Sequence, residues 1–85
     1  MNKWFVYILR CKDNTLYTGI TKNLTARIKA HTAGKGAKYT RGRAPFKLEC
    51  CVEVPDKSTA LKLESKIKKL SKSDKQDYIN GYLFL

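Results

Sequence analysis

A chain of 85 residues can build one small domain with a modest core, and its hydrophobic content of 42% excludes disorder along the whole length. The formal net charge of +11, from 18 basic and 7 acidic residues, favours a polyanionic partner, with nucleic acid ahead of an anionic membrane surface. No apolar run is long enough to cross a bilayer, and we interpret the short run near the start as a strand and not a signal peptide.

The first third of the chain predicts a hairpin and a short helix. Residues 4–11 form a nearly continuous apolar and aromatic run, which is typical of a central strand buried on both faces. Asp13 and Asn14 suit a turn, and residues 16–20 form the return strand. Asn23 is placed to cap a helix that begins at Leu24.

The remainder predicts a loop, a third strand and two helices. Residues 33–45 hold three glycines and a proline and predict a loop, and residues 46–54 predict a strand. Asp56 or Ser58 caps a helix that runs to about Ser71, and residues 72–80 predict a short last helix stopped by Gly81. We expect the final YLFL segment to pack on the core. The order β-β-α-β-α(-α) predicts an α+β fold, a small three-stranded, mainly antiparallel sheet flanked by helices, with residues 1–85 as a single domain.

The basic residues are concentrated in the middle of the chain. No acidic residue occurs between Asp13 and Glu49, so this span carries charge of one sign. We interpret the loop as a flexible basic finger against a phosphate backbone, with Tyr39 either stacking on a base or anchoring the loop. The candidate nucleic-acid-binding residues are Lys22, Lys35, Lys38, Tyr39, Arg41 and Arg43.

Cysteines occur at Cys11, Cys50 and Cys51. Adjacent cysteines in a strand point to opposite faces and do not suit a common disulfide. We expect all of them to be reduced thiols that act as small hydrophobic residues, which fits a reducing cytosol.

Several polar residues fall where a plain core would not place them. Glu64 lies within the apolar arc of its predicted helix, an arc that includes Leu61. It therefore needs a cation, either a core-facing lysine or arginine in an ion pair or a bound metal. His31 shares a helix face with Leu24 and Ile28, and Arg27 lies one turn before it. Together they form either an ordinary core histidine with a surface cation or a cluster that handles protons.

Tyr7 and Tyr17 are core-forming strand residues by default, and a tyrosine can act as a base only where cations lower its pKa. They reach one face of the sheet only if the hairpin pairs residues whose numbers have an even sum, such as Lys12 with Leu16. In this interpretation Gly19 lets the substrate backbone approach.

These residues together resemble the GIY-YIG endonuclease family. The two halves of its name motif correspond to FVY at residues 5–7 and YTG at residues 17–19, followed by Arg27, His31 and Glu64. The resemblance covers nearly the whole chain, and the loop is similar to that of small members such as structure-specific junction endonucleases.

The resemblance implies metal-assisted hydrolysis of phosphodiester bonds. Glu64 would hold Mg²⁺ or Mn²⁺. Tyr17 would activate the attacking water with His31 or Tyr7 assisting, Tyr7 would also position the phosphate or the water network, and Arg27 would stabilise charge on the phosphate. The asparagine that many members carry after the glutamate would be Gln76 or Asn80.

The resemblance also implies a biological setting. It favours DNA over RNA, a role in DNA repair or recombination, and weak sequence specificity, recognition of nucleic-acid shape or dependence on a protein partner. The short, lysine-rich chain itself suggests a bacterial cytosol, and we expect a monomer. Two other interpretations stay open: a catalytically silent nucleic-acid-binding module, and a structural protein of a ribonucleoprotein particle.

Overall fold

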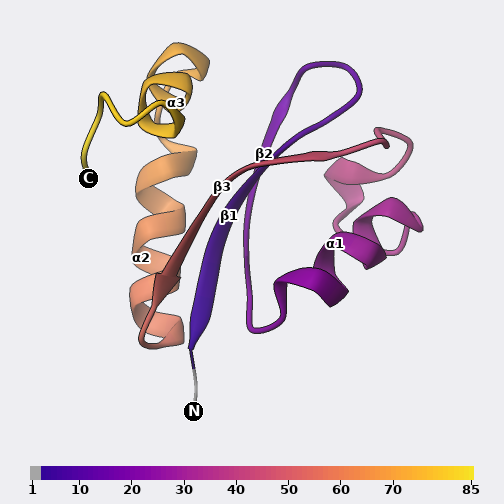
Figure 1. The fold of residues 1–85 in the computed structure, drawn as a ribbon, viewed down its shortest axis with the longest axis horizontal. Helices are drawn as coiled ribbons and strands as arrows, with labels where there is room; N and C mark the ends of the chain where they lie inside the picture. The colour runs from indigo at the N-terminus through magenta and orange to yellow at the C-terminus, as the bar shows by residue number, and fades with distance from the viewer. Residues whose placement is uncertain (1–2) are drawn as a thin grey trace.

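The computed structural model describes residues 3–85 and confirms the predicted order of elements (Figure 1). A short 3-10 turn lies inside the segment predicted as loop. The elements are β1 (Trp4–Arg10), β2 (Leu16–Thr21), α1 (Leu24–Thr32), the 3-10 turn η1 (Lys38–Thr40), β3 (Lys47–Val54), α2 (Lys57–Lys68) and α3 (Lys72–Ile79).

The three strands form one antiparallel sheet in the order β2-β1-β3. The central position of β1 is therefore confirmed, and four consecutive residues, Val6 to Leu9, are buried because both faces of this strand are covered. The strand β2 lies at an edge.

The hairpin register places Tyr7 and Tyr17 on the same face of the sheet. Tyr7 pairs with Gly19 and Leu9 pairs with Tyr17, so the paired numbers have an even sum, as the placement requires. The sum of the paired residue numbers is smaller by two than in the example of Lys12 with Leu16. A difference of two leaves each side chain on the same face of the sheet.

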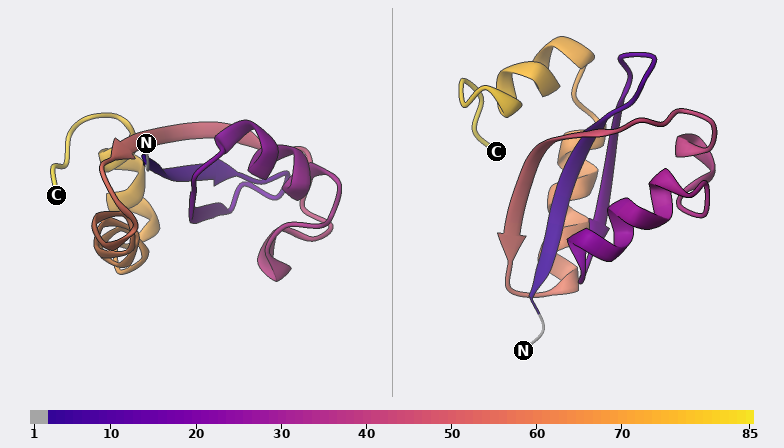
Figure 2. Two further views of the ribbon diagram at one scale, coloured as in Figure 1. Left: turned by 90° about the horizontal axis from the view of Figure 1, so that it is seen from below. Right: turned by 45° about the vertical axis from the view of Figure 1, so that its right-hand side comes forward.

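The hydrophobic core lies between the other sheet face and the two C-terminal helices. Its buried members come from β1, β3 and α2, and α3 contributes Tyr78 and Ile79 at its border. Figures 1 and 2 show α2 and α3 on one side of the strands and α1 with η1 on the other. The buried residues of this cluster are Val6, Ile8, Val54, Ala60 and Ile67.

Side-chain caps determine where the helices begin. The Oδ1 atoms of Asn23 and Asp56 accept from the N–H groups of Ala26 (3.1 Å) and Thr59 (2.7 Å). The helix α2 ends at Lys68, earlier than predicted, because Ser71 adopts an extended conformation to cap α3. No helix within residues 3–85 is both long enough and apolar enough to cross a membrane.

Two expectations about apolar packing are wrong. Leu61, predicted within the apolar arc of α2, is 46% exposed. The C-terminal segment does not pack on the core as a whole, since Tyr82 and Phe84 are 80% and 87% exposed. Tyr78 and Ile79 already border the core, and the positive φ of Gly81 turns the chain after α3.

Arg10 joins the end of the hairpin to β3 and α3. Its guanidinium donates to Glu49 Oε1 (2.5 Å), Asn14 Oδ1 (2.7 Å) and Gln76 Oε1 (2.5 Å). A bulge in the pairing of β1 with β3 leaves Glu49 without a residue opposite it, and such a bulge can re-aim a side chain.

The three cysteines are free thiols, as predicted. Cys11 is buried, Cys50 is half-buried and Cys51 is exposed, which agrees with adjacent residues pointing to opposite faces of β3. Burial raises the pKa of the Cys50 and Cys51 thiols, so neither is activated as a nucleophile.

Candidate active site

The hydroxyl of Tyr7 lies directly over Gly19 of the neighbouring strand. A β-carbon at position 19 would come within 2.5 Å of this hydroxyl oxygen and 2.7 Å of the attached ring carbon. The expectation that Gly19 admits the substrate backbone is therefore corrected, because the ring of Tyr7 fills that space. The glycine is needed for the phenol to reach its position.

A buried chain of hydrogen bonds leads from Tyr7 through His31 to the loop. The Tyr7 hydroxyl is 2.9 Å from His31 Nε2, and His31 Nδ1 is 2.7 Å from Thr40 Oγ1. Thr40 donates its single proton to the carbonyl of Ala37 (2.9 Å), so it accepts from Nδ1–H of His31. Nε2 of His31 is then free to accept from the hydroxyl of Tyr7.

The surroundings of His31 keep its ring neutral. The residue is 1% exposed, and burial, with a smaller effect of Arg27, lowers the pKa of the imidazole below its usual 6.5. A β-carbon on Gly36 would clash with the ring at 2.2 Å from Nδ1. Neither Gly36 nor Thr40 was singled out from the sequence, where nothing marks a loop threonine as the partner of a helix histidine.

Arg27 and Tyr17 complete the group on this face. Burial raises the pKa of Tyr7 to about 12, and the nearby Arg27 guanidinium opposes this rise. The pKa of Arg27 is itself raised, chiefly by its interaction with Tyr7 and further by Tyr17. The ring centroid of Tyr17 lies 6.3 Å from that of Tyr7 and 5.2 Å from that of His31.

Glu64 reaches this group from α2. Burial is the main cause of the raised pKa of Tyr7, and the charge of Glu64 adds a small contribution to it; the side chain of Glu64 is only 18% exposed. Its Oε2 lies 3.3 Å from Nζ of Lys68, one helical turn later. Lys68 is 53% exposed and does not face the core, so this pair is a weak contact at the rim that Lys68 can leave for water.

The donor set at Glu64 suits a hard divalent cation held largely by water. Within residues 3–85 no group of three or more histidine, cysteine, aspartate or glutamate side chains could hold a metal ion. Mg²⁺ does not need such a group, because it commonly keeps several waters and binds one carboxylate and substrate phosphate oxygens. Gln76 and Asn80 hydrogen bond to each other and Gln76 to Arg10, which engages both side chains outside this group.

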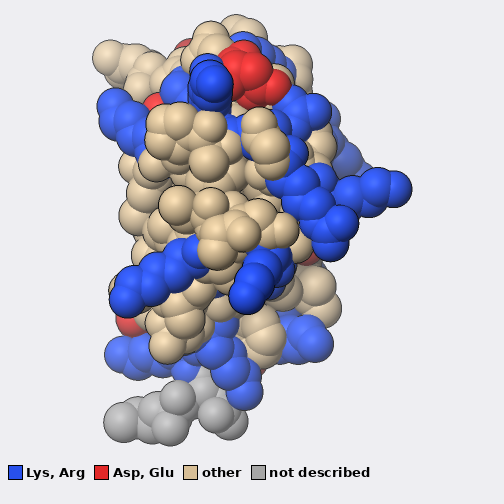
Figure 3. Space-filling model, turned by 90° about the vertical axis from the view of Figure 1, so that its right-hand side faces the viewer, with Lys and Arg blue, Asp and Glu red and all other residues tan. Residues whose placement is uncertain are grey.

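The loop around η1 carries most of the predicted nucleic-acid-binding residues. Lys35, Lys38 and Arg41 are exposed there. Arg43 forms an ion pair with Asp13 and lies 4.5 Å from the Tyr39 ring centroid, so its charge also ties the loop to the hairpin turn. Figure 3 shows lysine and arginine side chains around a mainly uncharged central area on the side of the molecule that carries α1 and this loop.

Lys22 lies apart from the loop. Its Nζ is 5.5 Å from the ring centroid of Trp4, and Nζ of Lys57 is 5.6 Å from the same centroid. Lys22 therefore belongs to a second basic area beside the start of β1.

The arrangement combines the parts that are needed to take a proton from a water molecule that attacks a phosphate. It holds a neutral imidazole coupled to a phenol, a second phenol, a guanidinium and a carboxylate. Such a group can accept a proton from water, neutralise developing negative charge and hold a cation.

Comparison with known proteins leads to one group of small bacterial proteins. Residues 3–78 match the family model of the GIY-YIG catalytic domain. The chain is 47% identical to the UPF0213 protein BH0048 of Halalkalibacterium halodurans over 76 residues, which cover 89% of this chain and 81% of the relative. It is 53% identical to the UPF0213 protein CPE1444 of Clostridium perfringens over 77 residues, which cover 91% of this chain and 83% of the relative.

Solved structures support the same grouping. The solution NMR structure of the UPF0213 protein BH0048 from Bacillus halodurans matches with a TM-score of 0.61 and 46% identity, over 92% of this chain and 83% of that chain. The solution NMR structure of the protein EF2693 from E. faecalis matches with a TM-score of 0.65 and 32% identity. The match covers 100% of this chain and 92% of that chain.

Proposed function

Because the chain belongs to the GIY-YIG catalytic domain family, a family of endonucleases, we propose that it is a metal-dependent endonuclease that hydrolyses phosphodiester bonds of DNA. The observation that carries this proposal is the buried hydrogen bond between Tyr7 and the neutral His31. A protein that only binds nucleic acid gains nothing from a buried proton acceptor or from a carboxylate facing phosphate.

The Tyr7–His31 pair removes the proton of the attacking water in this mechanism. Tyr7 alone, with a pKa of about 12, is a poor base at neutral pH. As the phenol takes a proton from water, its own proton passes to His31 Nε2 along the existing hydrogen bond of 2.9 Å. This assignment differs from the expectation that Tyr17 activates the water, and it leaves Tyr17 to position the water or the phosphate.

The remaining residues act on the phosphate. The water oxygen forms a bond to phosphorus as the bond from phosphorus to the 3′ oxygen breaks, which leaves a 5′ phosphate. Arg27 offsets the negative charge that develops on the phosphate oxygens. Glu64 would hold Mg²⁺ or Mn²⁺, which supplies Lewis-acid stabilisation of the phosphate and of the departing oxygen.

We propose that the whole chain acts as one nuclease domain, as a monomer in a bacterial cytosol. It would recognise nucleic-acid shape, or rely on a protein partner for specificity, in DNA repair or recombination. The exposed lysines and arginine of the η1 loop would contact phosphates.

The test compares the wild type with Glu64→Gln on labelled single strands, duplexes, flaps and four-way junctions, with Mg²⁺, Mn²⁺ or EDTA. We expect cutting that needs the metal and falls roughly a hundredfold or more in the variant, because the cation loses its protein ligand. Glu53→Gln is the matched control, since Glu53 is an exposed carboxylate on β3 that pairs with Lys3.

Binding to every substrate without cutting, unaffected by metal or by Glu64→Gln, would show a silent binding module. Equal cutting by wild type and Glu64→Gln would contradict the role of this carboxylate.

A further inference from the structure

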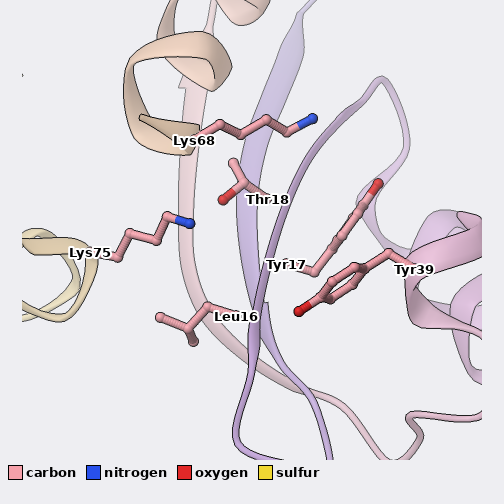
Figure 4. Close-up of a pocket in the computed structure, with 6 residues that line it drawn as sticks. All are labelled: Leu16, Tyr17, Thr18, Tyr39, Lys68 and Lys75. Atoms are coloured by element: carbon pink, nitrogen blue, oxygen red, sulfur yellow. The ribbon is translucent and has the colours of Figure 1, made fainter. Parts of the chain in front are cut away.

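A cavity of about 340 Å³ lies beside the candidate active site (Figure 4). Four elements contribute to it: β2, η1, α2 and α3. It adjoins the group described above at two points, since Tyr17 belongs to both and Lys68 forms the ion pair with Glu64. The lining residues are Leu16, Tyr17, Thr18, Tyr39, Lys68 and Lys75.

One lining residue has an unmet hydrogen-bonding need. Thr18 is 3% exposed, and its Oγ1 is the one buried side-chain polar atom within residues 3–85 that has no hydrogen-bond partner. A buried hydroxyl without a partner is costly, so a ligand group that can pair with it would bind more tightly. Figure 4 shows this hydroxyl on the side of Thr18 that faces Lys75, with the two tyrosines on the other side of Thr18.

The opposite walls differ in chemistry. Lys68 and Lys75 supply two cations to one wall. The ion-pair partner of Lys68 is Glu64 on its own helix. Tyr17 and Tyr39 supply a second wall, with their rings stacked at a centroid distance of 5.9 Å and an angle of 24°. A ligand that matches both walls carries a phosphate at one end and a flat ring at the other.

We propose that this cavity binds a single unpaired nucleotide of the strand that is cut, with its phosphate between Lys68 and Lys75 and its base against the tyrosine wall. The proposal rests on the proposed nuclease function and specifies its substrate. The cavity volume lies at the lower end of the range for ligand pockets, which suits one nucleotide. A stacked base pair in a duplex cannot enter a cavity of this size, so the nucleotide must leave the stack or come from a single strand.

The position of Lys68 links this cavity to the candidate active site. Its ammonium nitrogen lies 3.3 Å from Oε2 of Glu64. A phosphate in the cavity competes with Glu64 for this lysine and frees the carboxylate to bind a cation. Substrate with an unpaired nucleotide would therefore prepare the metal ligand as it binds.

The experiment measures binding, without cleavage, in EDTA. The probes are a short single strand and a duplex of the same sequence, each with one 2-aminopurine, and free dTMP serves as a competitor. Lys68→Gln/Lys75→Gln tests the phosphate wall, and Tyr39→Leu tests the aromatic wall. The control is Lys62→Gln/Lys66→Gln, which removes the same charge from the opposite face of α2, where both lysines are exposed.

We expect the single strand to lose roughly fivefold or more in affinity with Tyr39→Leu, because a stacking surface is removed. The Lys68→Gln/Lys75→Gln variant should lower the slope of log K against log salt by about 0.7 for the single strand, because the two lysines together neutralise one phosphate. The control pair should leave single-strand affinity close to wild type, and duplex binding should change little in either cavity variant.

The outcomes separate this proposal from the nuclease. An equal loss with the cavity pair and the control pair, or an equal loss on duplex and single strand, would overturn the nucleotide cavity even if the protein cuts DNA. Displacement of the strand by dTMP at equal concentration would show a site for free nucleotides and would also overturn it. Selective loss in the cavity variants would support it even if no substrate is cut.

Discussion

A single imidazole connects three parts of the molecule. His31 accepts a hydrogen bond from the hydroxyl of Tyr7 on the central strand and donates one to Thr40 of the loop. Burial, and to a smaller extent Arg27 on the same helix, lowers the pKa of His31. Its buried neutral state is thus a property of the folded protein. In the unfolded chain the same side chain titrates at about 6.5.

This difference makes stability depend on pH in a defined window. Because the pKa of His31 is lowered in the folded state, the unfolded state binds more protons between the folded pKa and 6.5. We expect the free energy of unfolding to fall as the pH drops below 6.5, by at most about 1.4 kcal/mol for each pH unit. Urea unfolding at a series of pH values measures it.

His31→Gln is the control, since it removes the titrating group and should flatten the curve in this window. Asp13 and Asp56 have pKa values lowered from 3.8 and titrate at more acidic pH, so they do not obscure the effect. A wild-type curve that matches the variant from pH 6.5 downward would contradict a buried neutral His31.

Some members of the candidate site could be predicted from the sequence and others could not. Tyr7, Tyr17, Arg27, His31 and Glu64 stood out because polar groups on apolar faces need an explanation. Thr40, Lys68 and Lys75 did not, because their significance arises from tertiary contacts. The spacing of Glu64 and Lys68 at i and i+4 is the one signal that could have indicated an ion pair.

At the scale of elements, Arg10 fastens α3 to the sheet. Its guanidinium reaches Gln76 on α3 and the bulged Glu49 on β3; the side chain of Glu49 is only 13% exposed and Gln76 is half-buried. The last helix contains no fully buried residue, so this contact supplements a limited apolar interface formed by Tyr78 and Ile79.

We expect Arg10→Met to lower the free energy of unfolding by roughly 2 kcal/mol or more, because it leaves the Glu49 carboxylate without its partner. Urea unfolding measures this change. Adding Glu49→Gln should recover part of the loss, since a neutral amide is less costly to bury than an unpaired carboxylate.

Gln76→Ala removes the link from Arg10 to α3, together with the exposed hydrogen bond from Gln76 to Asn80, and leaves the Arg10–Glu49 pair intact. It should speed hydrogen exchange in residues 72–79 more than in the strands. If exchange in α3 is unchanged, the helix is held by its apolar contacts alone.

The order of the helices and strands could be predicted from hydrophobic periodicity and helix caps. The end of α2, the bulge in β3 and the exposure of the C-terminal aromatic residues could not, because they depend on contacts between elements. The end of α2 was missed because Ser71 serves the next helix, and the bulge at Glu49 has no local signal. The exposure of Tyr82 and Phe84 was missed because hydrophobic residues predict burial only when space in the core remains.

At the scale of the whole molecule, charge is distributed unevenly. The chain carries a net charge of +11. The acid-free span between Asp13 and Glu49 includes α1 and the η1 loop, which border the candidate active site. A field of this kind attracts a polyanion to the face where the chemistry would occur.

We expect DNA binding to weaken steeply with salt, and Lys35→Gln/Lys38→Gln/Arg41→Gln to lower the slope of log K against log salt on duplex DNA by about 2.7. Fluorescence anisotropy in EDTA at several salt concentrations measures the slope. The control Lys62→Gln/Lys66→Gln/Lys72→Gln removes the same charge from α2 and α3, where it should change the slope far less. Equal slopes for the two triple variants would show that binding is not directed by the loop.

The close contact between Tyr7 and Gly19 imposes an order on mutational history. Any side chain larger than hydrogen at position 19 meets the phenol at 2.5 Å, so position 19 can change only after position 7 has become smaller. The reverse order is open, because a smaller residue at position 7 leaves Gly19 undisturbed. A lineage that abandons the phenol can then fill the glycine, and it cannot return to tyrosine without first reversing that step.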